Sequence, residues 1–137
     1  MPSDLKTSMS ISASGMRAQG ARLRTISENL ANANSGPEKV GDEPYRRRVV
    51  TFKNVFDRTL EADLVKMRGP FKDKSPFRLQ FDPNHPAADK DGYIKMPNVN
   101  TLIEMVDMRE AQRSYQANLS MIDSSKRMIQ RTIDLLR

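Results

Sequence analysis

The chain of 137 residues carries its two longest helix patterns at its two ends. Apolar residues recur at a three-four spacing over residues 3–34 and again over residues 101–136, which is typical of amphipathic helices. Seven of the eight prolines lie between these stretches, from Pro37 to Pro97. Since proline breaks a helix interior, neither helix continues through the middle. The sequence therefore predicts a mainly α protein with two long terminal helices and a loop-rich β insert.

The length of these helices is large for so short a chain. A compact domain of this size has a diameter of about 37 Å. A helix of about 32 residues is about 48 Å long and would extend beyond it. An extending amphipathic helix exposes an apolar stripe unless a partner covers it. This comparison favours an extended subunit of an assembly.

The first helix has a heptad-like apolar seam. Stepping by four and three from Leu5 gives nine positions, of which only Ser12 and Gln19 are polar. Such a seam predicts coiled-coil-like packing. Gly15 and Gly20 lie beside it; they allow close helix approach, and each costs about 1 kcal/mol of helix stability relative to alanine. We therefore expect poorly ordered ends in the isolated monomer.

The second helix begins with a capping-box pattern, Thr101-Leu102-Ile103-Glu104. From Met105 onward, eight of ten seam positions are apolar, and Gln112 and Lys126 are polar. We predict that both seams form subunit interfaces. The predicted interface residues are Leu5, Met9, Met16, Leu23, Ile26 and Leu30 in the first helix, and Met105, Met108, Tyr115, Leu119, Ile122, Ile129 and Ile133 in the second.

The middle of the chain mixes short extended segments with turn signals. We expect strands over residues 45–52, 65–67, 77–81 and 93–96, a short helix over 55–64, and turns at Gly69–Pro70, Asp82–Pro83 and Asp91–Gly92. The chain then divides into three parts: an N-terminal helix (1–36), a central insert (37–100) and a C-terminal helix (101–137).

The net charge of +6 raises the alternative of a nucleic-acid-binding helical protein. Acidic and basic residues are mixed throughout, however, and the one dense basic run is Arg46–Arg48. We interpret that run as a solvated or strand-edge cluster, and we expect no nucleic-acid partner.

Candidate chemistry is sparse. The chain has no cysteine, and its one histidine, His85, lies in a proline-rich turn, so a zinc site is not expected. A calcium-binding loop around Gly92 is not expected, because Ala87 and Asn98 would occupy the first and last loop positions, which normally supply carboxylates. We predict no enzyme, cofactor or metal; an enzyme centred on His85 is the weakest alternative. No apolar run is long enough to span a membrane. If the protein leaves the cytoplasm, we expect it to be exported without a cleaved signal peptide.

Three stretches resemble a known family. Residues 14–34, with Ser14-Gly15-Met16 and the run Asn29-Leu30-Ala31-Asn32-Ala33-Asn34, resemble the N-terminal signature of flagellar rod and hook proteins. Residues 82–100 and 104–118 resemble the proximal rod members of that family. The matching motif residues are Asn29, Asn32, Asn34, Asp82, Pro83, His85, Pro86, Asp89, Gly92, Tyr93, Pro97, Asn98 and Asn100.

The resemblance implies a structural, self-assembling subunit of the proximal rod in the bacterial flagellar basal body. Its terminal helices would form an inner tube that lines the export channel, in the periplasm. The implied partners are other copies of the chain, other rod subunits, the membrane-ring base with its rod adaptor, and the flagellar type III export apparatus.

Overall fold

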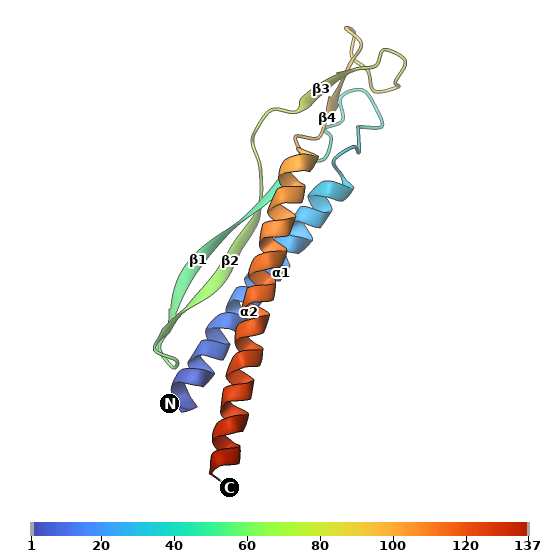
Figure 1. The fold of residues 1–137 in the computed structure, drawn as a ribbon. Helices are drawn as coiled ribbons and strands as arrows, with labels where there is room; N and C mark the ends of the chain where they lie inside the picture. The colour runs from blue at the N-terminus through green and yellow to red at the C-terminus, as the bar shows by residue number, and fades with distance from the viewer. Residues whose placement is uncertain (1, 137) are drawn as a thin grey trace. The chain divides into compact units, whose positions relative to one another are not determined.

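The computed structural model describes residues 2–136 and contains two long helices separated by four strands. Helix α1 (Pro2–Ala31) is followed by β1 (Arg48–Asp57), β2 (Ala62–Lys72), β3 (Arg78–Phe81) and β4 (Tyr93–Met96), and α2 (Thr101–Leu135) closes the chain (Figure 1). The prediction of two terminal helices around a small β insert is confirmed. Its coiled-coil-like part stays a prediction.

The chain forms two compact units, and each unit draws on both helices and on the insert. Of the described residues, unit 1 comprises 2–23, 51–68 and 109–136, and unit 2 comprises 24–50 and 69–108. The predicted division into an N-terminal helix, a central insert and a C-terminal helix follows the order of the sequence and differs in kind from these two spatial units, so it stays a prediction.

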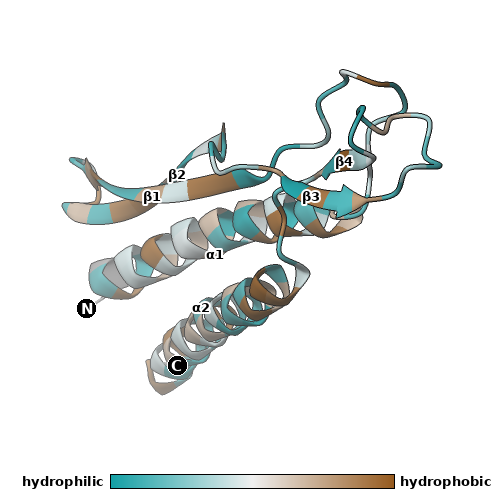
Figure 2. Cartoon of the chain, turned by 90° about the horizontal axis from the view of Figure 1, so that it is seen from above, coloured by the Kyte–Doolittle hydropathy of each residue, from teal (hydrophilic) through white to brown (hydrophobic). Residues whose placement is uncertain are grey.

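In unit 1, α1 lies between the strands and α2. The paired strands β1 and β2 cover one side of α1, and α2 runs along another side (Figures 1 and 2). Small residues on α1 allow both contacts. Ser14 and Ala18 are buried toward β2, while a Cβ added to Gly15 would lie only 3.0 Å from the Asn118 amide of α2. The expectation that small residues permit close helix approach is therefore confirmed at Gly15.

In unit 2, β3 and β4 form a short antiparallel ribbon. Phe81 pairs directly with Tyr93, and their rings meet edge to face with centroids 5.2 Å apart. One face of the ribbon buries Ile94, which joins Ile26 and Val99 in the core of this unit. The predicted strand over residues 93–96 and its role in closing a small sheet are confirmed.

Two predictions for the insert are wrong. The expected short helix over 55–64 is replaced by the end of β1, a turn and the start of β2. The carboxylate of Asp57 accepts hydrogen bonds from the backbone N–H groups of Thr59 and Leu60, which stabilises the turn. The expected turn at Gly69–Pro70 lies within β2 instead. Gly69 has φ +110°, and an added Cβ there would lie 3.1 Å from the Val49 carbonyl oxygen, so this glycine permits close strand approach.

The helix boundaries also need small corrections. Helix α1 ends at Ala31, and residues 32–34 form a turn rather than a last helical turn. At the start of α2, the N-cap is Asn100, whose side-chain oxygen accepts hydrogen bonds from the N–H groups of Leu102 and Ile103. The predicted capping box is wrong, because the Glu104 carboxylate points into the protein and binds other groups.

Candidate functional site

A buried polar cluster in unit 2 joins α1, the segment before β1 and the start of α2. We call it the polar cluster and define it by Asn29, Tyr45, Arg47 and Glu104, which are linked to one another by hydrogen bonds.

Asn29 is the centre of the cluster. Its Nδ2 donates to the Arg48 carbonyl (2.8 Å) and to Glu104 Oε2 (3.1 Å), and its Oδ1 accepts from the Arg48 N–H (2.9 Å) and the Tyr45 hydroxyl (2.8 Å). These four bonds use the full capacity of an amide side chain. A buried asparagine satisfied in this way orients the chain entering β1 against α1.

Arg47 is the cation of the polar cluster and lies close to three carboxylates. Its Nε donates to Glu104 Oε1 at 2.6 Å and its Nη1 to Asp73 Oδ2 at 3.4 Å, while Nη2 lies 3.7 Å from Asp107 Oδ2. The Arg47 side chain is 21% exposed and that of Glu104 is 1% exposed. A carboxylate this deeply buried requires a cationic partner and further hydrogen bonds, and Arg47 and Asn29 supply them.

Burial, hydrogen bonds and neighbouring charges shift the pKa values of Arg47, Asp73 and Tyr45. Burial alone would lower the pKa of Arg47, but hydrogen bonds and charges from Glu104 and Asp73 raise it above its ordinary value. A backbone hydrogen bond from Ser75 is the main cause that lowers the pKa of Asp73, with help from Arg47. Burial raises the pKa of Tyr45, so its hydroxyl remains a donor to Asn29.

The interpretation of Arg46–Arg48 as a solvated or strand-edge run is wrong for Arg47, because that side chain lies inside the cluster. Arg46 lies over the Phe77 ring at 4.2 Å and donates to the carbonyls of Asp73 and Ser75. Arg48 is more exposed and pairs with Glu28 at 3.2 Å. All three cations thus have partners within the chain.

Asn98 supports the cluster from the segment before α2. Its Oδ1 accepts the Arg47 N–H at 2.7 Å, and its Nδ2 donates to the Asp73 carbonyl and to both the carbonyl and the hydroxyl of Ser75. Pro97, beside it, is buried and accepts a hydrogen bond from Arg78.

The other motif residues form turns. In the loop that begins at Asp82, Asn84 donates to the Asp82 carboxylate, and His85 Nδ1 accepts the Ala87 N–H at 3.1 Å. Asp89 Oδ1 accepts from the N–H groups of Asp91 and Tyr93. Pro83 and Pro86 lie exposed in this loop, and the turn at Gly92, with φ +82°, is confirmed. These bonds support the structural interpretation of His85.

The motif asparagines near the end of α1 have unequal roles. The Asn32 Nδ2 donates to the Glu28 carbonyl at 2.8 Å, which adds a second hydrogen bond to a carbonyl that also accepts the Asn32 N–H at 3.1 Å. Asn34 is exposed, and its backbone carbonyl accepts the Gly36 N–H.

The predicted interface residues differ in burial within the chain. Ile26 is buried in the core of unit 2, whereas Met105, Leu119 and Ile133 are exposed. The remaining positions are half-buried; they are Leu5, Met9, Met16, Leu23 and Leu30 in α1, and Met108, Tyr115, Ile122 and Ile129 in α2. Their role in contacts between subunits stays a prediction.

At the start of α2 the usual burial pattern of an amphipathic helix is reversed, with a charged residue inside and apolar residues outside. Glu104 is buried, while Leu102 (70%), Ile103 (52%), Met105 (51%) and Val106 (59%) are exposed. Figure 2 shows the apolar colouring of this end of α2. We call the four apolar residues the outward face. Exposed apolar side chains gathered in this way are typical of protein interfaces.

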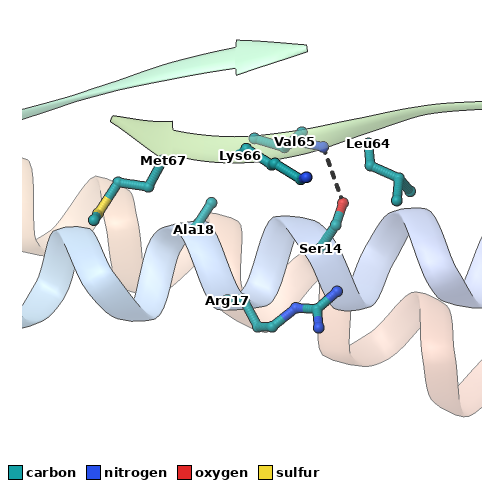
Figure 3. Close-up of a pocket in the computed structure, with 7 residues that line it drawn as sticks. All are labelled: Ser14, Arg17, Ala18, Leu64, Val65, Lys66 and Met67. Carbon is teal, nitrogen blue, oxygen red and sulfur yellow. Dashed lines mark hydrogen bonds between the residues drawn. The ribbon is translucent and has the colours of Figure 1, made fainter. Parts of the chain in front are cut away.

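A groove of about 330 Å³ lies in unit 1 between α1 and β2. Figure 3 shows Ser14 and Ala18 pointing from α1 toward β2. The Ser14 hydroxyl donates to the Ile11 carbonyl and accepts the Val65 N–H at 3.1 Å, so it attaches the strand to the helix. The lining includes Arg17 and Lys66 but no histidine, cysteine or carboxylate, which leaves no pair of groups for acid–base chemistry.

Over residues 2–136, no three acidic, histidine or cysteine side chains gather in a way that would hold a metal ion. Within the same range, neither helix is long and apolar enough to cross a membrane.

Comparison with known proteins decides the family. A family model described as flagella basal body rod protein matches residues 9–37, and one described as flagellar basal body rod FlgEFG protein C-terminal matches residues 90–135. The flagellar basal-body rod protein FlgC of Agrobacterium fabrum is 47% identical over 133 residues, which cover 97% of this chain and 96% of that protein. The chain belongs to the FlgC family of flagellar basal-body rod proteins.

More distant members of the FlgC family match over similar lengths. The FlgC protein of Borreliella burgdorferi is 35% identical and covers 97% of this chain and 98% of itself. That of Salmonella typhimurium is 38% identical and covers 91% of this chain and 92% of itself. The predicted resemblance is confirmed, and the chain is a structural subunit of the flagellar basal-body rod.

Proposed function

We propose that the chain builds the proximal part of the rod and that it assembles there through its two terminal helices. The observation that carries this proposal is the apolar surface left exposed on α2. In unit 2 this surface is the outward face, and in unit 1 it includes Met121, Met128 and Ile133, each about half exposed. Burial of such side chains between subunits favours assembly, with a gross hydrophobic gain of about 25 cal/mol per Å² of apolar surface before the entropic cost of association is subtracted.

The partners in this proposal are other copies of the chain and other rod subunits, with the membrane-ring base and its rod adaptor at one end. The helices would together line an inner tube through which exported subunits pass. The chain itself would be a substrate of the flagellar type III export apparatus and would act in the periplasm. It would carry out no catalysis and would need no cofactor.

A charge placed in the exposed surface of α2 tests the proposal. We expect Met128→Glu to abolish swimming in soft agar and to remove the chain from isolated basal bodies. The carboxylate would replace an apolar side chain in the contact between subunits, and burying it would require desolvation of the charge together with the neighbouring Arg127 and Arg131. Ser120→Glu is the matched control, since it adds the same charge at an exposed polar position of the same helix.

The Ser120→Glu control should swim normally. Both variants, when purified, should keep the helical circular dichroism of the parent. If a folded Met128→Glu chain is incorporated and supports swimming, assembly does not use this part of α2.

A further inference from the structure

Unit 2 contains a short exposed turn over residues 38–43, which we call the acidic turn. All six of its residues are exposed, whereas Pro37 and Pro44 on either side are buried. The Asp42 N–H donates to the Lys39 carbonyl at 3.2 Å, and Gly41 has φ +93°, as the third residue of a type II β-turn does. The turn is thus held at both ends, and its second position presents Val40, which is 65% exposed.

The charge of the acidic turn is opposite to that of the chain. It carries the three carboxylates of Glu38, Asp42 and Glu43 and one cation, Lys39, so its net charge is −2 on a chain of net charge +6. Within residues 2–136, only Glu43 of these carboxylates has an ion pair, at 4.0 Å to Arg46, and its side chain is 74% exposed. Such a long, exposed pair contributes little, so the acidic turn has negative charge available for a partner.

The groove of unit 1 has the complementary properties. Its apolar lining includes Ala18, Leu64 and Met67, and its volume of about 330 Å³ admits a branched aliphatic side chain. Arg17 on α1 and Lys66 on β2 add two cations to the lining (Figure 3). Within residues 2–136 neither cation has an ion pair, and the lining holds no carboxylate. The groove therefore suits a ligand that joins an apolar side chain to negative charge.

We propose that the acidic turn of one copy docks in the groove of a second copy. Val40 enters the apolar part of the groove, and the Asp42 and Glu43 carboxylates lie near the two cations. This inference rests on the proposed assembly of the chain into the rod and names one of its contacts. Attraction between the acidic turn and these cations offsets, at the contact, the repulsion between two basic copies. Because the turn is already ordered, docking costs little conformational entropy.

A second copy fits as the occupant because the acidic turn and the groove are different surfaces of one chain. Each copy can use its turn toward one neighbour and its groove toward another, which makes the contact heterologous. Heterologous contacts that do not close into a ring produce helical assemblies. The relatives of this chain are rod proteins, and a rod requires contacts that repeat in this way.

The absence of cysteine from the chain allows a crosslinking test in basal bodies. Two full-length forms are produced together in one strain, one with Val40→Cys and the other with Met67→Cys, and each carries a different affinity tag. After mild oxidation we expect a disulfide-linked pair that contains both tags. Ser120→Cys in place of Met67→Cys is the matched control, since it is exposed in unit 1 outside the groove, and should give no such pair.

The outcomes separate this inference from the proposed function. Incorporated copies that form no pair with both tags, or that pair equally well with Ser120→Cys, overturn the docking. A crosslink from Val40→Cys to a different protein overturns the second copy as the occupant. Absence of the parent chain from isolated basal bodies would instead contradict the proposed function.

An exchange of charge gives a second test that needs no cysteine. We expect Lys66→Glu to reduce swimming and the amount of the chain in basal bodies, because the reversed charge repels the acidic turn. Adding Asp42→Lys to the same chain should restore both. Lys53→Glu, at an exposed position of unit 1 outside the groove, is the control and should behave as the parent. Parental swimming of Lys66→Glu, or no restoration in a double variant with parental circular dichroism, would overturn the docking.

Discussion

The guanidinium Nε of Arg47 lies 2.6 Å from the carboxylate oxygen Oε1 of Glu104, across 57 positions of sequence. This bond joins the segment before β1 to the start of α2, and Asn29 joins both to α1. The family motif at the end of α1 thus has a physical role within the chain, because its first asparagine completes a buried ion pair.

Replacement of Arg47 by lysine tests the geometry of that pair. Lysine keeps the charge but lacks the planar fork that reaches Glu104, Asp73 and Asp107 together. We expect Arg47→Lys to lower the free energy of unfolding by about 1–3 kcal/mol, measured by urea denaturation. Arg58→Lys, in an exposed turn, should change it by no more than about 0.5 kcal/mol. Equal stability of the two variants would show that only the charge of Arg47 matters.

Truncation of Asn29 should be among the most damaging polar substitutions. Asn29→Ala removes four hydrogen bonds and leaves the Arg48 backbone groups and the Tyr45 hydroxyl without their partner. We expect a loss of about 2–4 kcal/mol in unfolding free energy, because buried groups are left unsatisfied. Asn34→Ala, at an exposed position of the same motif, is the matched control and should be nearly neutral. A neutral Asn29→Ala would contradict the central role of this amide.

Asp73 should make the free energy of unfolding depend on pH in the acidic range. Its pKa in the folded chain is lowered from 3.8, first by the Ser75 backbone N–H and further by Arg47. Its contribution is therefore present above the unfolded pKa and is lost as pH falls through the lower folded value. The parent should be more stable than Asp73→Asn at pH 7, and this difference should shrink below about pH 4. Urea titrations of both proteins across this range measure it; a difference that is constant with pH would refute the linkage.

Two glycines of α1 give a matched comparison of helix propensity and packing. An added Cβ at Gly20 has no atom within 4 Å, so Gly20→Ala should stabilise the chain by about 0.5–1 kcal/mol. At Gly15 the Cβ would lie 3.0 Å from Asn118 Nδ2, which donates to the Ser114 carbonyl. We expect Gly15→Ala to gain less or to destabilise, as judged by thermal unfolding. A larger gain at Gly15 than at Gly20 would show that α1 and α2 do not approach closely there.

His85 should behave as a turn residue. His85→Ala removes the acceptor for the Ala87 N–H, and we expect a loss of about 1 kcal/mol in unfolding free energy with swimming retained. His85→Asn keeps an acceptor and should recover part of this loss. Loss of swimming in a folded, incorporated His85→Ala chain would assign His85 a role in contacts with partners.

The helices were predictable from sequence because their signals are local. Apolar periodicity placed both, and the proline distribution bounded them within a few residues. Local signals failed where the decisive contact is distant. The Thr101–Glu104 pattern has the form of a capping box, but Glu104 is bound by Arg47 and Asn29, which are far away in sequence.

A similar limit applies to which face of α2 is buried within the chain. Periodicity alone fixes the spacing of a seam but not the rotation of the helix about its axis. The seam started at Met105 therefore includes exposed Leu119 and Ile133, whereas the chain buries Glu104, Ala111 and Ser125 on α2. A carboxylate within the apolar run Leu102–Val106 was the one available sign that this helix has a polar inner side.

The most direct measurement is a density map of the isolated basal body at side-chain resolution. We predict that Leu102 and Val106 of one copy lie against another copy, while Glu104 remains bound to Arg47 of its own chain. A map in which Leu102 and Val106 face solvent, or in which Glu104 pairs with a neighbouring chain, would contradict the account.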